Sequence, residues 1–193
     1  MLVLASASPR RSELLTQAGF TFAVHPAHIA EDLQPGEEPV AYVTRLAREK
    51  AEHIYRQLVP TMGPRLVVLG ADTTVTLDNH ILGKPEDATD AARMLALLSG
   101  RDHQVITGVA VVTAEGASVA AEVTRVWFDS PTEAEIASYI ASGEPMDKAG
   151  AYGIQGRAAR WIPRVEGCYF NVMGLPIARV ARMLTAAGMV NGA

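Results

Sequence analysis

Short apolar runs predict two buried strands, at residues 2–5 and 66–69. Each run lacks a polar position, as expected for a strand that is covered on both faces. Further strands are predicted where apolar and β-branched residues gather between turn signals, at residues 74–77, 80–82, 105–113, 117–128 and 161–165. The segments 74–77 and 80–82 are expected to form a hairpin across Asp78-Asn79.

Apolar residues at helical spacing predict helices between these strands. Ser8 and Pro9 are typical of an N-cap and a first helical position, and Gly19 is typical of a helix end. The longest helix is expected from about residue 40 to residue 58, with Lys50 at the same spacing as its apolar residues. Further helices are predicted at residues 87–98, from about 131 to 142, and from 176 to 188.

Helices and strands alternate along the chain, which predicts an α/β fold with a mixed, twisted sheet and flanking helices. A capping box at Ser130-Pro131-Thr132-Glu133 is expected to open the helix that ends near residue 142. Residues 31–39 form an acidic, proline-punctuated loop, and residues 143–156 form a glycine-rich loop. Because no linker is apparent, residues 1–193 are expected to form a single domain.

The composition is that of a globular protein without a nucleic-acid partner. Hydrophobic residues make up 49% of the chain, which is enough for a sizeable core. The 17 Lys and Arg against 21 Asp and Glu leave a net charge of −4, whereas nucleic-acid binding favours a basic surplus. Cys168 is the only cysteine, which excludes an intrachain disulfide and a cysteine zinc site. With no bilayer-length apolar run and no signal-peptide pattern, we expect a cytoplasmic protein without a membrane partner.

The segment Ser6-Ala7-Ser8-Pro9-Arg10-Arg11 joins a predicted strand to a predicted helix. A helix N-terminus offers free N–H groups and a positive dipole end, so it can bind anions. The two guanidinium groups and two hydroxyls add donors that match phosphate oxygens. The local pattern is equally consistent with a capped helix that carries two solvated arginines.

A second candidate is Gly70-Ala71-Asp72-Thr73, directly after the buried strand at residues 66–69. Ligands in α/β proteins bind outside the carboxyl ends of strands, and Asp72 is expected at such an end. Its carboxylate could hold Mg²⁺ or orient a water. The alternative is that Asp72 and Thr73 begin a turn.

The third candidate is the set of lysines, of which the chain has only three. Lys84 and Lys148 lie in short segments bounded by glycine and proline, a setting that can direct a side chain into a site. Lys50 lies on the long helix with Arg45 and Arg48, where a solvated helix face is the simpler interpretation. The five histidines have no metal-ligand spacing, and neither a phosphate-binding P-loop nor a dinucleotide motif is present.

Several motifs in a fixed order extend from residue 3 to about residue 185. They are Ser6-Ala7-Ser8-Pro9-Arg10-Arg11, Leu46-Ala47-Arg48-Glu49-Lys50-Ala51, Gly70-Ala71-Asp72-Thr73, Gly83-Lys84-Pro85, Leu98-Ser99-Gly100 with His103-Gln104-Val105 and Thr107-Gly108-Val109, Asp147-Lys148-Ala149-Gly150-Ala151-Tyr152-Gly153-Ile154-Gln155-Gly156, and Val172-Met173-Gly174-Leu175-Pro176. Together they resemble the Maf family (septum formation inhibitor Maf), whose members are nucleoside triphosphate pyrophosphatases.

The resemblance implies a two-lobed α/β fold related to inosine triphosphate pyrophosphatases, with the active cleft between the lobes. It also implies cleavage of a nucleoside triphosphate to the monophosphate and pyrophosphate, with Mg²⁺ or Mn²⁺ required. Asp72 then corresponds to the general base and Glu31 to an acidic residue on the loop before the long helix, although Asp32 competes for that position. A homodimer is also implied.

The family has one branch that prefers dTTP and UTP and another that prefers 7-methyl-GTP. The positions that mark the branches correspond here to Arg10, Thr73 and Gln155, and the run that contains Gln155 resembles the dTTP/UTP branch. The segment Cys168-Tyr169-Phe170-Asn171 departs from relatives, which often have Ser or Asp before the aromatic residue, and this puts the base pocket in doubt.

These residues suggest a mechanistic hypothesis. Ser8, Arg10, Arg11 and the helix amides would bind the triphosphate, while Lys50, Lys84 and Lys148 neutralise its charge. Glu31 and Asp72 would bind the metal, and Gln155 would read the base. The rival interpretation is a non-catalytic nucleotide sensor that regulates cell division.

Overall fold

One mixed sheet runs the length of the molecule. The computed structural model describes residues 1–189. The sheet order is β2 (Phe22–Val24), β1 (Leu2–Leu4), β3 (Val67–Leu77), β5 (Asp102–Thr113), β6 (Gly116–Trp127) and β7 (Arg164–Glu166), and β4 (His80–Leu82) pairs with β3. The strand β1 is parallel to β2 and β3, whereas the other pairs are antiparallel. The predicted mixed sheet is therefore confirmed.

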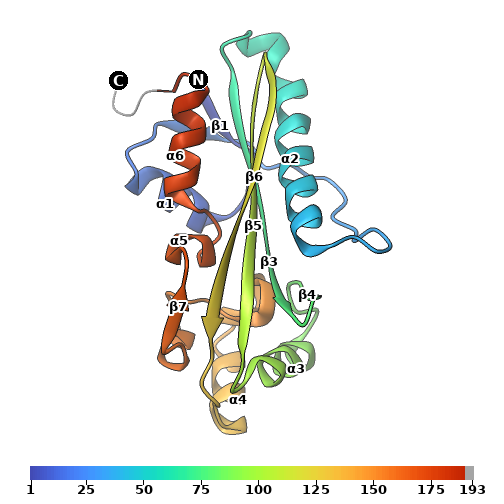
Figure 1. The fold of residues 1–193 in the computed structure, drawn as a ribbon, viewed down its shortest axis with the longest axis vertical. Helices are drawn as coiled ribbons and strands as arrows, with labels where there is room; N and C mark the ends of the chain where they lie inside the picture. Colours follow the sequence, from blue (N-terminus) through green and yellow to red (C-terminus); the bar gives the residue numbers. More distant parts are fainter. Residues whose placement is uncertain (190–193) are drawn as a thin grey trace.

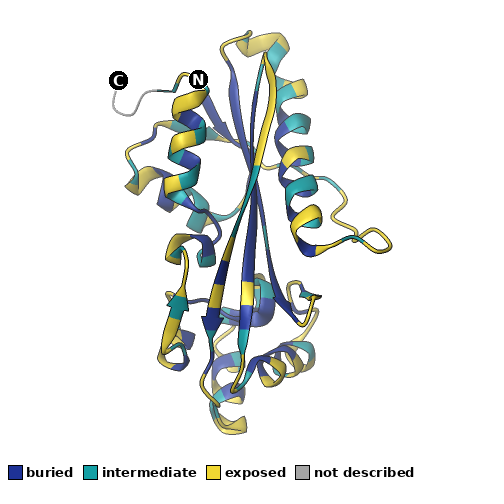
Figure 2. Ribbon diagram, in the orientation of Figure 1, coloured by how far each residue is buried: buried dark blue, intermediate teal, exposed yellow. Residues whose placement is uncertain are grey.

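Helices cover both faces of the upper part of this sheet (Figure 1). The helices α1 (Pro9–Gln17) and α6 (Ile177–Ala186) bury Leu15 and Leu184 against β1 and β3. The long helix α2 (Pro39–Met62) covers the opposite face of β3 and β5, with Ala47 and Ala51 in its core cluster. As a result, the central strands are buried while the outward faces of the helices are exposed (Figure 2).

Glycines let α2 approach the sheet closely. A Cβ on Gly70 would lie 2.1 Å from the carbonyl oxygen of Ala47, and one on Gly108 would lie 2.2 Å from that of Val43. Because Gly70 and Gly108 lie on the neighbouring strands β3 and β5, the backbone of α2 rests directly on the sheet. This close contact determines how near the side chains of α2 lie to those of β3.

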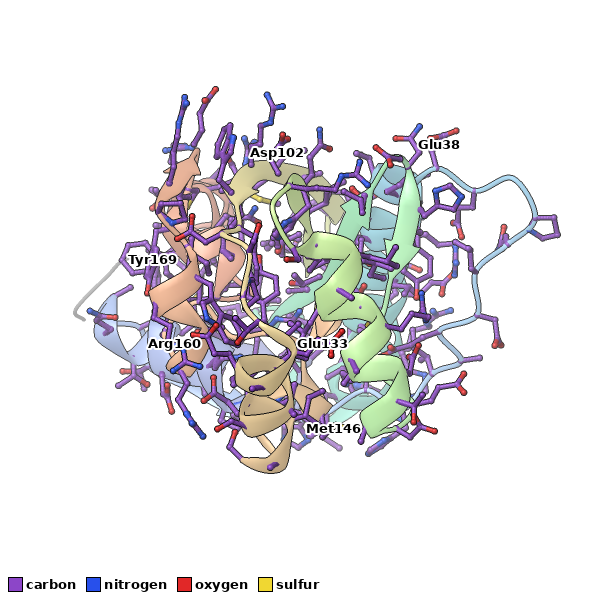
Figure 3. All side chains as sticks on the ribbon, turned by 90° about the horizontal axis from the view of Figure 1, so that it is seen from below. Glu38, Asp102, Glu133, Met146, Arg160 and Tyr169 are labelled. Atoms are coloured by element: carbon purple, nitrogen blue, oxygen red, sulfur yellow. The ribbon has the colours of Figure 1, made fainter. Side chains whose placement is uncertain are left out.

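The lower part of the molecule has its own aromatic core. The helices α3 (Ala88–Leu98) and α4 (Glu133–Ala141) contact one another across this end, which Figure 3 shows from below. Between them and the sheet pack Phe128, Tyr139, Tyr152 and Trp161, whose rings meet at centroid distances of 4.9–6.2 Å. Three short 3₁₀ segments complete this lobe, η1 (Glu144–Asp147), η2 (Ala149–Ala151) and η3 (Arg157–Trp161). The short helix α5 (Tyr169–Val172) leads back to the upper lobe.

The largest correction concerns the strand that carries Asp72. Residues 70–73 were expected to follow the end of a strand at residues 66–69, but β3 continues through them to Leu77. Asp72 pairs with Gly108 of β5 and so lies in the middle of a strand. The reason is that the carboxylate of Asp72 lines the cavity and contacts Lys50 there, so its burial in the strand is compensated and the ladder is not interrupted. The predicted hairpin is confirmed, since Asp78 and Asn79 both have positive φ.

Other boundaries also differ from the predictions. The capping box belongs to Thr132 and Glu135, two residues later than expected, because Thr132 bonds the amide that Glu135 carries. The helix α2 runs four residues beyond position 58, with Pro60 in its last turn, where few amide bonds are lost. The strand expected at residues 161–165 is the end of η3 followed by β7. The elements β2 and α5 were not predicted.

None of the helices formed by residues 1–189 combines the length and the apolar character that crossing a membrane requires.

Candidate active site

A cavity of about 590 Å³ lies between the upper and lower parts of the molecule. Segments far apart in the chain line it: the β1–α1 turn, the middle of β3, the loop after β4, and the 3₁₀ segments of the lower lobe. All ten residues proposed from the sequence are among its lining residues, namely Ser8, Arg10, Arg11, Glu31, Lys50, Asp72, Thr73, Lys84, Lys148 and Gln155. The structure thus brings the set together, while the role of each residue stays a prediction.

At the centre of the cavity, one lysine contacts two carboxylates. The Nζ of Lys50 lies 2.7 Å from Oδ1 of Asp72 and 2.6 Å from Oε1 of Glu31. Lys50 and Asp72 are each only 7% exposed, whereas the Glu31 side chain is half-exposed on its loop. The interpretation of Lys50 as part of a solvated helix face is therefore wrong, because Lys50 lies on the buried stripe of α2.

Burial dominates the electrostatics of Asp72. It raises the pKa of the Asp72 carboxyl above its usual value, against the opposing effect of Lys50 and Arg11. The same carboxylates act on Tyr42, which also lines the cavity, where burial and then Asp72 and Glu31 raise the phenol pKa to about 12. The centre therefore combines a buried base of raised proton affinity with a lysine that holds it.

The β1–α1 turn differs from the predicted phosphate cradle in the hydrogen bonds that Ser8 and Arg11 make. Ser8 is the N-cap of α1, but its side chain makes no capping hydrogen bond, and its amide donates to Oγ of Ser6. Arg11 donates four hydrogen bonds to other groups of the protein. Its guanidinium donates to Gly174 O, Ser6 Oγ, Ala71 O and Thr73 Oγ1, at 2.8–3.0 Å.

These bonds change the interpretation of Arg11. The four acceptors come from segments as distant as residues 6 and 174, so Arg11 joins α1 to the β1–α1 turn, to β3 and to the segment before α6. Burial lowers the pKa of Arg11, but a guanidinium remains charged in proteins. Its expected role in gripping phosphate directly is therefore not supported by its hydrogen bonds; its charge still faces the cavity that it lines.

Arg10 contacts the opposite wall of the cavity. Its Nη1 lies 3.1 Å from Oδ2 of Asp147, and Nζ of Lys148 lies 2.6 Å from Oδ1 of the same carboxylate. Asp147 was not singled out from the sequence, although its place beside Lys148 could have suggested the pair. Lys84 is exposed and, among residues 1–189, makes no ion pair, so its ammonium group is available to a ligand.

Gln155 lies on a turn that the lower lobe holds rigidly. The amide of Gly153 donates to the hydroxyl of Tyr139, which donates to Oε1 of Glu144 at 3.0 Å. The amide of Arg157 also donates to the Glu144 carboxylate. Both ends of the turn are fixed in this way, while the Gln155 side chain stays exposed at the cavity.

Two carboxylates are available for a divalent cation. Glu31 and Asp72 approach a common point, since both contact the same Nζ atom. Within residues 1–189, no group of three or more His, Cys, Asp or Glu side chains forms a complete metal site. Mg²⁺ is commonly held by one or two carboxylates together with water and substrate phosphates, so this donor set fits such an ion.

The chain matches one family model and is similar in sequence to several known proteins. The family model described as Maf-like protein matches residues 1–187. The chain is 53% identical to the dTTP/UTP pyrophosphatase of Koribacter versatilis over 98% of this chain and 95% of that protein. It is 51% identical to the dTTP/UTP pyrophosphatase of Chromobacterium violaceum over 97% and 94%. Among solved structures, it is similar to a nucleoside-triphosphatase / dITP/XTP pyrophosphatase from Mycobacterium abscessus, with 18% identity, a TM-score of 0.43 and 96% coverage of both chains.

Proposed function

This chain belongs to the Maf family, and from that premise we propose that it hydrolyses dTTP and UTP to the nucleoside monophosphate and pyrophosphate. The names of its relatives support the activity and the substrates. The observation that carries the proposal is the cavity itself. All three lysines of the chain line it together with the buried carboxylate of Asp72, an arrangement suited to a polyanionic substrate that needs a base.

In the proposed reaction, Asp72 accepts a proton from the attacking water. The water oxygen forms a bond to the α phosphorus, and the bond from that phosphorus to the oxygen bridging the α and β phosphates breaks. Pyrophosphate leaves with the electron pair of that bond. Lys50 holds Oδ1 of Asp72, and in residues 1–189 no hydrogen bond occupies Oδ2, which is the atom we assign to proton transfer.

The lysine and arginine side chains of the cavity have different roles towards the negative charge of the substrate. Lys84 makes no ion pair within the described chain, so we assign it to the phosphates, where it neutralises the charge that builds up on the leaving group. Lys148 and Arg10 share Asp147, and a phosphate entering the cavity would compete for both. Arg11 acts indirectly, since it holds Thr73 and the β1–α1 turn in place.

A divalent cation, Mg²⁺ or Mn²⁺, is part of the proposal. Glu31 and Asp72 would hold it, together with substrate oxygens. Such an ion supplies charge neutralisation on the phosphates and makes a bound water more acidic. Asp32 is the weaker candidate for the loop acid, because its carbonyl contacts Arg45 whereas the Glu31 carboxylate reaches Lys50.

Selection of the base is assigned to Gln155, with Arg10 and Thr73. A glutamine amide offers one acceptor and two donors, which can match the edge of thymine or uracil, including modified pyrimidines. Gln155→Ala should therefore lower the ratio of kcat/KM for dTTP to that for GTP. An unchanged ratio would remove Gln155 from base selection.

A pyrophosphate-release assay tests the proposal directly. The protein with Mg²⁺ is given dTTP, UTP, GTP, 7-methyl-GTP, ATP and CTP separately, and pyrophosphate is measured. Faster turnover of dTTP and UTP is the expected result. A preference for 7-methyl-GTP would move the protein to the other branch, and no release from any nucleotide would favour the non-catalytic regulator of cell division.

The biological setting belongs to the same proposal. We assign the activity to the cytoplasm, where nucleotide pools reside, and to a homodimer, with neither nucleic acid nor membrane as a partner. Removal of unwanted nucleotides is the role that fits this activity, and an effect on septum formation is a second role that the family name suggests. Light scattering of the purified chain measures the oligomeric state.

A further inference from the structure

Glu31 lies on a loop that has no regular structure to hold it. Residues 25–38 contain no helix or strand, and we name residues 31–38 the acidic loop. Even so, Oε1 of Glu31 lies 2.6 Å from Nζ of Lys50, although half of the Glu31 side chain is exposed. A single ion pair of this exposure is weak and does not by itself fix a loop. Other contacts must hold Glu31 at the cavity.

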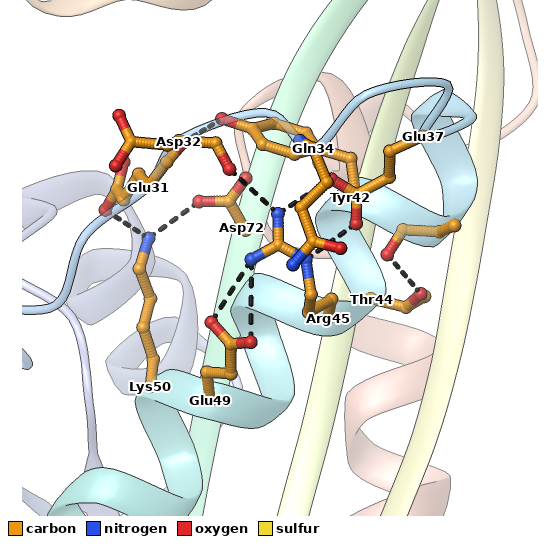
Figure 4. A network of polar contacts seen from close by, with 11 residues as sticks. Glu31, Asp32, Gln34, Glu37, Tyr42, Thr44, Arg45, Glu49, Lys50 and Asp72 are labelled. Carbon is orange, nitrogen blue, oxygen red and sulfur yellow. Dashed lines mark hydrogen bonds and ion pairs between the residues drawn. The ribbon is translucent and has the colours of Figure 1, made fainter.

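Two residues on one face of α2 hold the backbone of the acidic loop (Figure 4). The hydroxyl of Tyr42 donates to the carbonyl oxygen of Glu31 at 2.9 Å. Nη2 of Arg45 donates to the carbonyl oxygen of Asp32 at 3.0 Å. Positions 42 and 45 are neighbours on a helix surface, so α2 binds two consecutive loop carbonyls from one face.

Arg45 also holds the far end of the loop. Its Nε and Nη2 atoms lie 2.6 and 2.7 Å from the two carboxylate oxygens of Glu37, a two-pronged contact. The Glu37 side chain is only 9% exposed, and its Oε2 accepts a bond from the amide of Gln34. The guanidinium of Arg45 thus joins residues 32, 34 and 37 into one unit.

We propose that Arg45 is a positioning residue that acts through the acidic loop to keep the Glu31 carboxylate at Lys50 and Asp72. Arg45 does not line the cavity and touches no reacting group. The inference rests on the proposed function, in which Glu31 helps to hold a divalent cation. It adds that Arg45, a residue outside the cavity, keeps the acidic loop ordered and thereby supports cation binding.

The proposal makes a specific statement about side-chain shape. A lysine at position 45 keeps the charge, but a single ammonium cannot reach both oxygens of Glu37 and the carbonyl of Asp32 together. Arg45→Lys should therefore restore only part of the function that Arg45→Met loses. Glu37→Gln keeps the shape of the partner and removes its charge, and should resemble Arg45→Met in weaker form.

The first experiment measures Mn²⁺ binding by calorimetry, without nucleotide. Loss of a residue that orients a metal ligand typically weakens metal affinity by roughly 10- to 100-fold, and Arg45→Met should fall in this range. The control is Arg56→Met, which removes an exposed ion pair with Glu52 on the same helix and leaves the loop untouched. Hydrogen exchange of the acidic loop should quicken in Arg45→Met and Glu37→Gln but not in Arg56→Met.

A double-mutant cycle tests whether Arg45 acts through Glu31. If it does, adding Arg45→Met to Glu31→Gln should weaken Mn²⁺ binding by less than about twofold beyond Glu31→Gln alone. With saturating Mn²⁺, kcat for dTTP should largely recover in Arg45→Met, whereas a fold defect would not recover.

The two proposals fail in different ways. Wild-type protein that releases no pyrophosphate refutes the proposed function, and loop exchange then still decides the role of Arg45. Active wild-type protein with unchanged loop exchange in Arg45→Met overturns the positioning role. Full additivity in the cycle overturns it as well, because the effect would then bypass Glu31.

Discussion

Two carboxylates near the cavity differ in their surroundings, and the difference bears on which of them can act as a base. Burial raises the pKa of Asp72. Partial burial also acts to raise the pKa of Asp147, but the hydrogen bonds and charges of Lys148 and Arg10 together outweigh it and lower that pKa. A carboxylate with raised proton affinity is better suited to accept a proton near neutral pH. The buried position of Asp72 thus supports its assignment over that of Asp147.

Replacement of Asp72 by asparagine keeps the shape of the side chain and removes its charge. We expect Asp72→Asn to lower kcat by on the order of 10²–10⁴, the usual size of a lost acid–base role. Steady-state kinetics with dTTP and Mg²⁺ measure the effect. Asp102→Asn, at a surface ion pair with Arg125, is the control. Turnover near the wild-type rate in Asp72→Asn would show that the base has been assigned wrongly.

The neighbours Arg10 and Arg11 should respond differently to the same change. Arg11→Lys leaves several of its four acceptors unpaired, so we expect about 2 kcal/mol of lost stability. Arg10→Lys affects one exposed ion pair and should change stability by less than about 1 kcal/mol. Urea unfolding of both variants provides the comparison. Equal stabilities would refute the structural role of Arg11.

Sequence patterns predicted which residues share the cavity better than what each one contacts. The helical spacing placed Lys50 among the apolar residues of its helix, and its burial follows from that pattern. The partners of Arg11 could not be predicted in this way, because one of them, the carbonyl of Gly174, lies 163 positions away in the chain. Backbone acceptors leave no signature in the residue types of a sequence.

At the scale of elements, the contact of α2 with the sheet fixes the depth of Lys50. The helix carries Lys50 about two turns after the point where Val43 meets Gly108, and the strand β3 carries its partner Asp72. Any separation of α2 from the sheet therefore moves the ammonium away from the carboxylate. The same helix holds the acidic loop through Arg45, so one element positions both Lys50 and its loop partner Glu31.

This arrangement predicts the effect of adding a methyl group between α2 and the sheet. In Gly108→Ala the new Cβ would lie 2.2 Å from the carbonyl oxygen of Val43, so the helix must shift. Overpacking of this kind typically costs about 1–3 kcal/mol, and kcat should fall more than the loss of folded protein explains. Chemical denaturation and kinetics measure the two effects. Gly83→Ala, where a Cβ meets nothing within 4 Å, is the control for stability.

Periodicity predicted the long elements well and the irregular ones poorly. The sequence predicted two separate strands in place of the continuous β3, because glycine and aspartate usually interrupt strands. In the structure, Gly70 faces the backbone of α2 and Asp72 faces the cavity. Local propensity does not include these tertiary surroundings. The 3₁₀ segments of residues 144–161 and the helix α5 have no apolar period of their own, so only packing against the lower lobe defines them.

For the molecule as a whole, the distribution of charge is more informative than its sum. The net charge of −4 indicates an acidic protein, but all three lysines line one cavity. A cavity with low-dielectric walls concentrates the field of such charges, which favours entry of an anionic ligand. The fold therefore creates a local concentration of positive charge in a chain whose net charge is negative.

The lower lobe links the stability of the whole molecule to pH through His103. This imidazole is 2% exposed, and its Nε2 lies 2.7 Å from the hydroxyl of Tyr152, a residue that lines the cavity. Its Nδ1 has no hydrogen-bond partner among residues 1–189. Burial lowers the pKa of His103 from 6.5 to about 4, so the folded protein holds this side chain neutral.

Protonation of His103 should therefore favour the unfolded chain in an identifiable pH range. Above pH 6.5 the side chain is neutral in both states and has no pH-dependent effect; as the pH falls from 6.5 to about 4, only the unfolded chain takes up the proton. Stability is lost across this range, by up to about 3 kcal/mol, and the loss stops below it. Urea unfolding at several pH values measures the effect against His103→Gln, which retains the acidic residues but cannot titrate there. The variant should be less stable at pH 7 and its stability should fall less steeply towards pH 4, so parallel curves for the two proteins would exclude His103 as the cause.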